Sequence, residues 1–320
     1  MLLRSSLLVL LSFTTLWSTV EAADVAIVKS ADLRYYDAAI MGFKAGLPPM
    51  TKVKEYSLEG QLARGREIGK SLRASPPDLV FAVGLKAAIS AKLEIFDTPV
   101  VFCMVLNPDA YDLPTANMTG IAVRTSPETQ LAALRSLMPD RKRVGVLYGE
   151  DHAKAFIQDA REAARQQGLD LVSVAVHRPE DVPHALRGLL QQIDVLWLIQ
   201  DQVIVSESTI PVFLESSLSD GVPIFTFSST LVQQGAVGAL VLDPWAVGRQ
   251  AAHLSLTRLK DTGALAGTLA APEHSQWALN LKSAEHFNIR LNPELIRLAG
   301  QVFSGTGPIA HRRDSSALIP

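Results

Sequence analysis

Continuous apolar runs, each opened by a polar residue or a proline, occur in two similar pairs along the chain. The first pair is Asp78–Gly84 and Pro99–Phe102, the second is Asp194–Gln200 and Pro223–Phe227, and a helix-like segment separates the members of each pair. Runs rich in Val, Ile and Phe are typical of strands buried on both faces of a parallel sheet. The intervening segments supply the crossovers that parallel strands need. The pattern therefore predicts two similar α/β lobes.

Strands alternate with helices over the rest of the chain, which predicts doubly wound parallel sheets in both lobes. Further strands are expected at Val25–Lys29, Thr51–Tyr56, Arg143–Leu147, Leu169–Val176, Ala239–Leu242 and Trp277–Leu281. We expect Asp32 to cap the first helix. The expected division gives residues 23–122 plus 244–262 to lobe 1 and residues 123–243 plus 263–299 to lobe 2. Residues 300–320 are expected to be a flexible C-terminal tail.

The N-terminus has the pattern of a secretory signal peptide. Arg4 precedes an apolar stretch from Leu7 to Trp17, and the small residues Ala22 and Ala23 follow. A basic start, a short apolar core and small residues at the cut site predict that residues 1–22 direct export to the periplasm. The mature protein is then not membrane-embedded. The alternative is an uncleaved anchor helix.

Composition excludes several classes of function. The chain has 30 basic and 32 acidic residues, so charge gives no case for a nucleic-acid partner. The single cysteine, Cys103, excludes an internal disulfide and is expected to be a buried core thiol. No nucleophile elbow, phosphate loop or His-Glu-x-x-His motif is present, so we expect no enzyme activity, no cofactor and no metal.

Polar residues stand where the predicted strands end. Open parallel sheets place ligands outside the carboxyl ends of their strands, near helix N-termini. The candidate ligand-binding residues are Ser30, Tyr36, Gly84, Leu85, Lys86, Asn107, Tyr148, Gln200, Asp201, Ser228, Ser229 and Asp243. For Asp201, Asp243 and Ser228 the alternative is that they only cap helices or fix loops.

Several blocks of the sequence resemble one family of transport proteins. The run YSLEGQLARGREIGKSLRASPPDLVFAVGLKAA from Tyr56 to Ala88, the block Asn117–Gly120 and the strand Arg143–Tyr148 are similar to ABC transporter substrate-binding proteins of the tryptophan/tyrosine-binding-protein-like family. The resemblance implies the type I periplasmic-binding-protein fold, with two lobes joined by three crossing strands and a ligand cleft between them.

The resemblance also implies binding positions. Those that carry over are Ser30, Gly84, Lys86, Asn107, Tyr148, Asp201, Ser228 and Asp243. In amino-acid-binding members a small hydroxyl residue often follows the glycine, at the place that Leu85 and Lys86 hold here. Lys86 is available to meet a carboxylate instead, and Tyr35 and Tyr36 to form a stacking wall.

The function expected from these features is an exported solute-binding protein that captures a small organic ligand, amino-acid-like or carboxylate-bearing, and delivers it to an ABC-type permease. The alternative partner is a membrane receptor or sensor kinase. A repressor-like regulator would need a helix-turn-helix where the signal segment stands. As a cleft-lining carboxylate, Asp201 is expected to be replaceable by alanine with weaker binding and intact folding.

Overall fold

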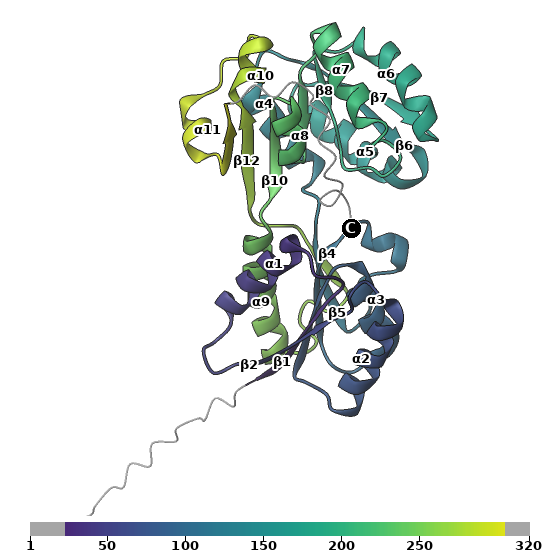
Figure 1. Ribbon diagram of the computed structural model, residues 1–320, viewed down its shortest axis with the longest axis vertical. Coiled ribbons are helices and arrows are strands. Elements are labelled where there is room, and N and C mark those ends of the chain that lie inside the picture. The colour runs from purple at the N-terminus through teal and green to yellow at the C-terminus, as the bar shows by residue number, and fades with distance from the viewer. Residues whose placement is uncertain (1–22, 305–320) are drawn as a thin grey trace, which may run out of the picture.

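The protein forms two lobes, each built around its own twisted sheet (Figure 1). The architecture is taken from a computed structural model, which describes residues 23–304. The predicted signal segment, residues 1–22, and the end of the predicted tail, residues 305–320, lie outside the described residues.

The sheet of lobe 1 has six strands, all parallel, in the order β11-β5-β4-β3-β1-β2. The strands are β1 (Asp24–Lys29), β2 (Lys52–Ser57), β3 (Leu79–Val83), β4 (Val100–Val105), β5 (Met118–Ala122) and β11 (Thr268–Ala270). Every residue of β3 and β4 is buried. The continuous apolar runs that predicted central strands are thus confirmed, because both faces of these strands are covered.

Helices cover both faces of the lobe 1 sheet. They are α1 (Arg34–Gly46), α2 (Leu62–Ala74), α3 (Leu85–Glu94) and α9 (Pro244–Lys260), with the short 3-10 helix η1 (Pro108–Tyr111) after β4. One apolar core lies under α1 and α9 and the other under α2 and α3. Cys103 lies in the first of these cores, and burial raises the pKa of its thiol. The expectation of a buried core thiol is confirmed.

The sheet of lobe 2 has seven strands in the order β13-β12-β10-β9-β8-β6-β7. The strands are β6 (Arg143–Gly149), β7 (Asp170–Val176), β8 (Val195–Trp197), β9 (Ile224–Thr226), β10 (Gly238–Leu242), β12 (Ser275–Asn280) and β13 (Gln301–Phe303). β12 runs antiparallel to β10 and the other pairs are parallel. A mainly parallel sheet with one reversed pair near its edge is a common variant of this architecture.

The lobe 2 helices lie on both faces of the sheet. They are α4 (Pro127–Leu137), α5 (Glu150–Gln166), α6 (Val182–Leu190), α7 (Ile210–Asp220), α8 (Ser229–Gln234), α10 (Leu281–His286) and α11 (Pro293–Leu298), with a 3-10 turn η2 (Pro179–Asp181) before α6. Residues of α4, α5 and α10 bury one core around Trp197, and those of α6, α7 and α8 bury the other. Both lobes are therefore doubly wound, as the sequence predicts.

The chain passes between the lobes three times. It leaves β5 for α4 through residues 123–126, leaves β10 for α9 at Asp243, and leaves β11 for β12 through residues 271–274. Figure 1 shows these passages as the connections between the two bodies. Helix α9 thereby returns to lobe 1, where it packs along α1.

Three sequence expectations need correction. β11 pairs with β5, so residues up to Ala270 belong with the first sheet and not with lobe 2. β13 pairs with β12, so part of the expected tail is a strand. Asp32 does not cap α1, whose N-cap position is Leu33, because its carboxylate forms an ion pair with Lys29 (2.8 Å) and accepts a hydrogen bond from Ser57 (3.2 Å).

The α1–α9 contact depends on two glycines. A Cβ at Gly248 of α9 would lie 1.9 Å from the carbonyl oxygen of Ala39, and one at Gly42 of α1 would lie 2.0 Å from that of Trp245. The two helix backbones therefore touch without intervening side chains. This close packing fixes α9, which enters lobe 1 only after the chain has built most of lobe 2.

Candidate ligand-binding site

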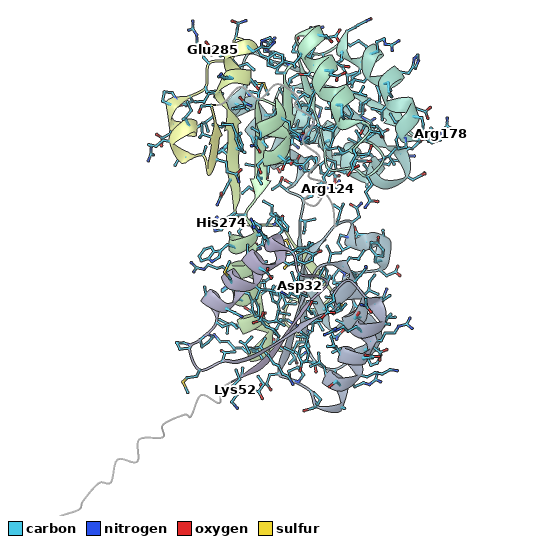
Figure 2. The ribbon with its side chains drawn as sticks, in the orientation of Figure 1. Asp32, Lys52, Arg124, Arg178, His274 and Glu285 are labelled. Atoms are coloured by element: carbon cyan, nitrogen blue, oxygen red, sulfur yellow. The ribbon has the colours of Figure 1, made fainter. Side chains whose placement is uncertain are left out.

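The carboxyl ends of the strands in the two lobes face each other. β5 runs from its carboxyl end into lobe 2, and β10 runs from its carboxyl end into lobe 1. All other lobe 1 strands run parallel to β5, and β6, β7, β8 and β9 run parallel to β10, so the carboxyl ends of these strands are turned toward the other lobe. Figure 2 places Asp32 and Arg124 at these edges, one on each lobe. Most of the residues singled out from the sequence follow these strand ends.

Ser30, Tyr36 and Gly84 form one packed unit at the start of α3. The Ser30 hydroxyl accepts a hydrogen bond from the Ala87 amide (2.9 Å). Gly84 has a positive φ of 87°, and a Cβ there would lie 2.6 Å from the Tyr36 hydroxyl and 2.7 Å from Ser30 Oγ. Tyr36 is 3% exposed, so its ring is part of the core and not a free stacking wall. These residues hold the helix N-terminus in place.

The other lobe 1 candidates, Leu85, Lys86 and Asn107, follow the carboxyl ends of β3 and β4, and their contact with a ligand stays a prediction. The Lys86 ammonium donates to the Gly60 carbonyl (2.6 Å), and Leu85 packs against the core under α2 and α3. Asn107 adopts a left-handed conformation at the start of η1, where its side chain makes no capping bond. The first-turn amides of α3 are the donors that the helix itself leaves without a partner. Lobe 1 thus contributes mainly backbone donors at this edge.

Asp201 is buried, with 5% of its surface exposed. Its Oδ2 accepts from the Gly149 amide (2.9 Å), and its Oδ1 accepts from the amides of Val203 (2.8 Å) and Ile204 (3.3 Å). The carboxylate therefore ties the end of β6 to the loop that follows β8. The premise that Asp201 is no part of the folded framework is wrong, although contact with a ligand stays a prediction.

Asp243 caps α9, as the alternative interpretation has it. Its Oδ1 accepts from the amides of Trp245 (3.0 Å) and Ala246 (3.3 Å), and its Oδ2 accepts from Gln276 Nε2 (2.5 Å). Asp243 is the passage from β10 into lobe 1, and Gln276 follows the passage from β11. The carboxylate thus joins two of the three interlobe passages.

The remaining lobe 2 candidates lie at the expected strand ends. Tyr148 is 8% exposed and belongs to the core around Trp197. Ser228 and Ser229 are half-buried at the start of α8, and the Ser228 side chain makes no capping bond. Gln200 is half-buried after β8. The two serines therefore place hydroxyl groups at the N-terminus of α8, and the Ser228 hydroxyl makes no capping bond there.

Arg124 was missed by the sequence reasoning. It lies half-buried in the passage from β5 to α4, with its guanidinium 4.0 Å from the centroid of the Phe156 ring. Nη1 reaches the Gln200 carbonyl at 3.5 Å. Burial lowers the pKa of Arg124, and the charge of Asp201 opposes that shift. The only signal in the sequence is a basic residue in a short connection between a predicted strand and a predicted helix.

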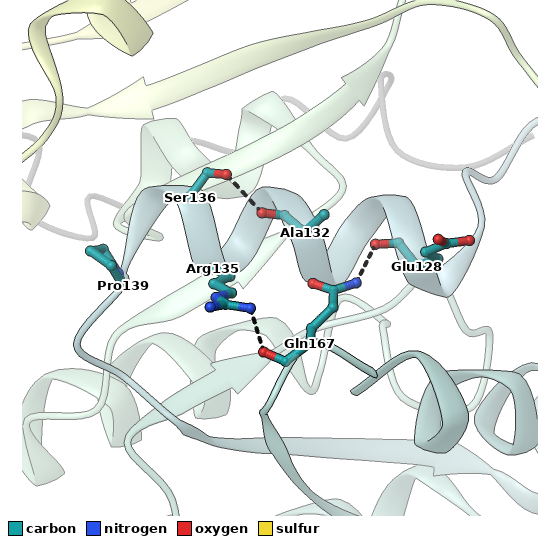
Figure 3. Close-up of a pocket in the computed structure, with 6 residues that line it drawn as sticks. All are labelled: Glu128, Ala132, Arg135, Ser136, Pro139 and Gln167. Atoms are coloured by element: carbon teal, nitrogen blue, oxygen red, sulfur yellow. Dashed lines mark hydrogen bonds between the residues drawn. The ribbon is translucent and has the colours of Figure 1, made fainter. Parts of the chain in front are cut away.

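A surface hollow of about 490 Å³ lies elsewhere, along α4 (Figure 3). Its lining is Glu128, Ala132, Arg135, Ser136, Pro139 and Gln167. Arg135 donates to the Gln167 carbonyl, Gln167 to the Glu128 carbonyl and Ser136 to the Ala132 carbonyl. The lining comes from α4 and from the residues that follow α4 and α5, so no strand end borders the hollow. The facing strand ends remain the better candidate site.

Residues 23–304 offer neither a metal cluster nor a membrane span. This part of the chain holds no group of three or more His, Cys, Asp or Glu side chains placed to share a metal ion. It also holds no helix with the length and hydrophobicity required to cross a bilayer.

Two doubly wound lobes, three passages between them and polar groups at the facing strand ends define a protein of the type I periplasmic-binding-protein fold. The chain belongs to the ABC transporter substrate binding protein family, whose model matches residues 36–303. The resemblance noted in the sequence is thereby confirmed.

Individual relatives are distant. The tyrosine-binding protein of Clostridioides difficile (strain R20291) is 22% identical over 227 residues, which are 68% of this chain and 65% of that protein. The ABC domain from Streptococcus pneumonia in complex with L-Trp is 22% identical, with a TM-score of 0.60 over 88% of this chain and all of that one. The ligand-free, open structure of CD0873 from Clostridium difficile, a substrate binding protein with adhesive properties, is 19% identical, with a TM-score of 0.74 over 89% of this chain and all of that one.

Proposed function

We propose that the protein is an exported solute-binding protein that captures a small amino-acid-like or carboxylate-bearing ligand between its lobes. Residues 1–22 would direct it to the periplasm, and an ABC-type permease would receive the ligand. The family to which the chain belongs favours the permease over a sensor as partner. The relatives that bind tyrosine or tryptophan favour an amino-acid-like solute.

The observation that carries this proposal is the facing of the two carboxyl edges. Lobe 1 supplies the amides at the start of α3 other than that of Ala87, which donates to Ser30. Lobe 2 supplies the hydroxyls of Ser228 and Ser229 at the start of α8 together with Arg124. Donors of hydrogen bonds on both sides suit a solute with an anionic group. A solute that touches both lobes stabilises the arrangement in which they are close, because only differential affinity shifts such an equilibrium.

The direct test is mass spectrometry of small molecules released by denaturing purified protein, followed by calorimetry with the compounds found. We expect one or a few amino-acid-like or carboxylate-bearing solutes that rebind at a stoichiometry of one. Release of nothing, together with no heat from a panel of amino acids and small carboxylates, would contradict the proposal.

A further inference from the structure

Arg124 is placed to meet an anion that residues 23–304 do not supply. Among the described side chains no carboxylate forms an ion pair with it, and its one polar contact is the long 3.5 Å approach to the Gln200 carbonyl. A guanidinium carries five donors in a planar fork. Most of that donor capacity is therefore unused, although the side chain is half-buried.

Asp201 is the carboxylate whose charge acts on the pKa of Arg124, but it does not form an ion pair with the guanidinium. Its charge raises the pKa of Arg124, but its two oxygens are already engaged by the amides of Gly149, Val203 and Ile204. Burial outweighs it, since the pKa of Arg124 is lowered overall. A partly desolvated cation without a direct counter-ion gains when a desolvated anion reaches it.

The Arg124 side chain is also held in position. The ring of Phe156, on α5, lies under the guanidinium at 4.0 Å from its centroid, which fixes the plane of the fork. Since Arg124 stands in the passage from β5 to α4, the fork lies where the two carboxyl edges face each other (Figure 2). Its orientation is thus set before any ligand arrives, which reduces the cost of binding.

We propose that Arg124 is the residue that selects the ligand class, by binding one carboxylate of the solute through its guanidinium fork. This rests on the proposed function and deepens it. A carboxylate matches the fork in geometry and carries a single negative charge. A phosphate dianion is a poorer match, because one guanidinium beside the negative charge of Asp201 cannot neutralise two charges.

The test compares each acid with its carboxamide by calorimetry, using L-tyrosine against L-tyrosinamide and L-tryptophan against L-tryptophanamide. For the parent protein we expect the acid to bind at least about 10-fold more tightly than the amide. In Arg124→Gln the Kd of the acid should rise about 10- to 100-fold, and the preference for acid over amide should largely disappear. A merely structural role would weaken both ligands equally and keep the preference.

Arg178→Gln is the matched control, because Arg178 is an exposed arginine of the same lobe that is paired with Asp181. It follows the outermost strand, β7, and Figure 2 shows it at the outer side of lobe 2, away from Arg124. The Arg178→Gln variant should bind like the parent. Arg124→Lys, which keeps the charge and loses the fork, should fall between parent and Arg124→Gln. Inorganic phosphate should compete weakly or not at all with a bound acid.

The results separate this inference from the proposed function. Equal binding of acid and amide by the parent overturns the role of Arg124 without any variant, so a poorly folded Arg124→Gln does not block the test. An unaltered preference in a folded Arg124→Gln overturns it as well. If neither probe pair binds and the solute released from the protein is uncharged, the inference fails while solute binding stands. If no solute binds at all, the proposed function fails.

Discussion

Replacing Gly248 by alanine is expected to destabilise lobe 1 by about 3 kcal/mol, because overpacking of a close contact costs about 1–3 kcal/mol and occasionally more. The new Cβ would lie 1.9 Å from the Ala39 carbonyl oxygen, which is backbone and cannot swing away as a flexible side chain would. α1 and α9 must therefore separate. The helix itself would gain up to about 1 kcal/mol from the exchange, so any loss is steric in origin.

Urea denaturation measured by circular dichroism checks this expectation. The matched control is Gly188→Ala in α6, where an added Cβ meets no atom within 4 Å. That variant should be as stable as the parent or more stable by up to about 1 kcal/mol. If Gly248→Ala were as stable as Gly188→Ala, the direct backbone contact between α1 and α9 would be wrong.

Replacing Asp201 by alanine is expected to lower the free energy of unfolding by about 2–4 kcal/mol. The change leaves the amides of Gly149, Val203 and Ile204 without their acceptor at a site that is only 5% exposed. Loss of charge-assisted hydrogen bonds costs about 1.5–3 kcal/mol, and buried donors left unpaired add to it. Asp201→Asn should lie between, because its amide oxygen still accepts.

Asp243→Ala is the control for this measurement, since Asp243 is also an aspartate that accepts from backbone amides but is more exposed. Loss of an N-cap costs about 1 kcal/mol. In thermal melts, the melting temperature of Asp201→Ala should therefore fall further below that of the parent than the melting temperature of Asp243→Ala does. If Asp201→Ala has the melting temperature of the parent and loses only ligand binding, Asp201 acts as a ligand group alone and the expected structural role is wrong.

The fully buried parallel strands were the part of the fold that the sequence predicted best. β3 and β4 are apolar throughout because helices cover both of their faces, so composition alone marks them. β11 and β13 are three residues each and carry no such pattern. They exist because β5 and β12 offer free edges, and that information is tertiary. The reversal of β12 likewise depends on the route of the chain between the lobes.

The candidate site was predictable in location and less so in chemistry. Strand ends mark where polar groups gather, which placed Ser30, Gly84, Ser228 and Asp243 at the facing edges. Whether such a group is committed to a backbone partner depends on loop geometry that no local pattern encodes. The sequence pattern therefore predicts a free carboxylate at Asp201, whereas in the structure this carboxylate is a buried hydrogen-bond acceptor. Loop geometry also leaves the Arg124 guanidinium with a single long polar contact. A loop has no hydrophobic periodicity from which this could be predicted.

The central claim is that a small ligand binds between the two lobes and draws them together. Small-angle X-ray scattering tests it most directly, on protein freed of ligand by denaturation and refolding and then titrated with the solute found by mass spectrometry. The radius of gyration is expected to fall as the site fills and to reach its minimum at one ligand per chain. Saturation of binding by calorimetry with an unchanged radius of gyration would contradict it.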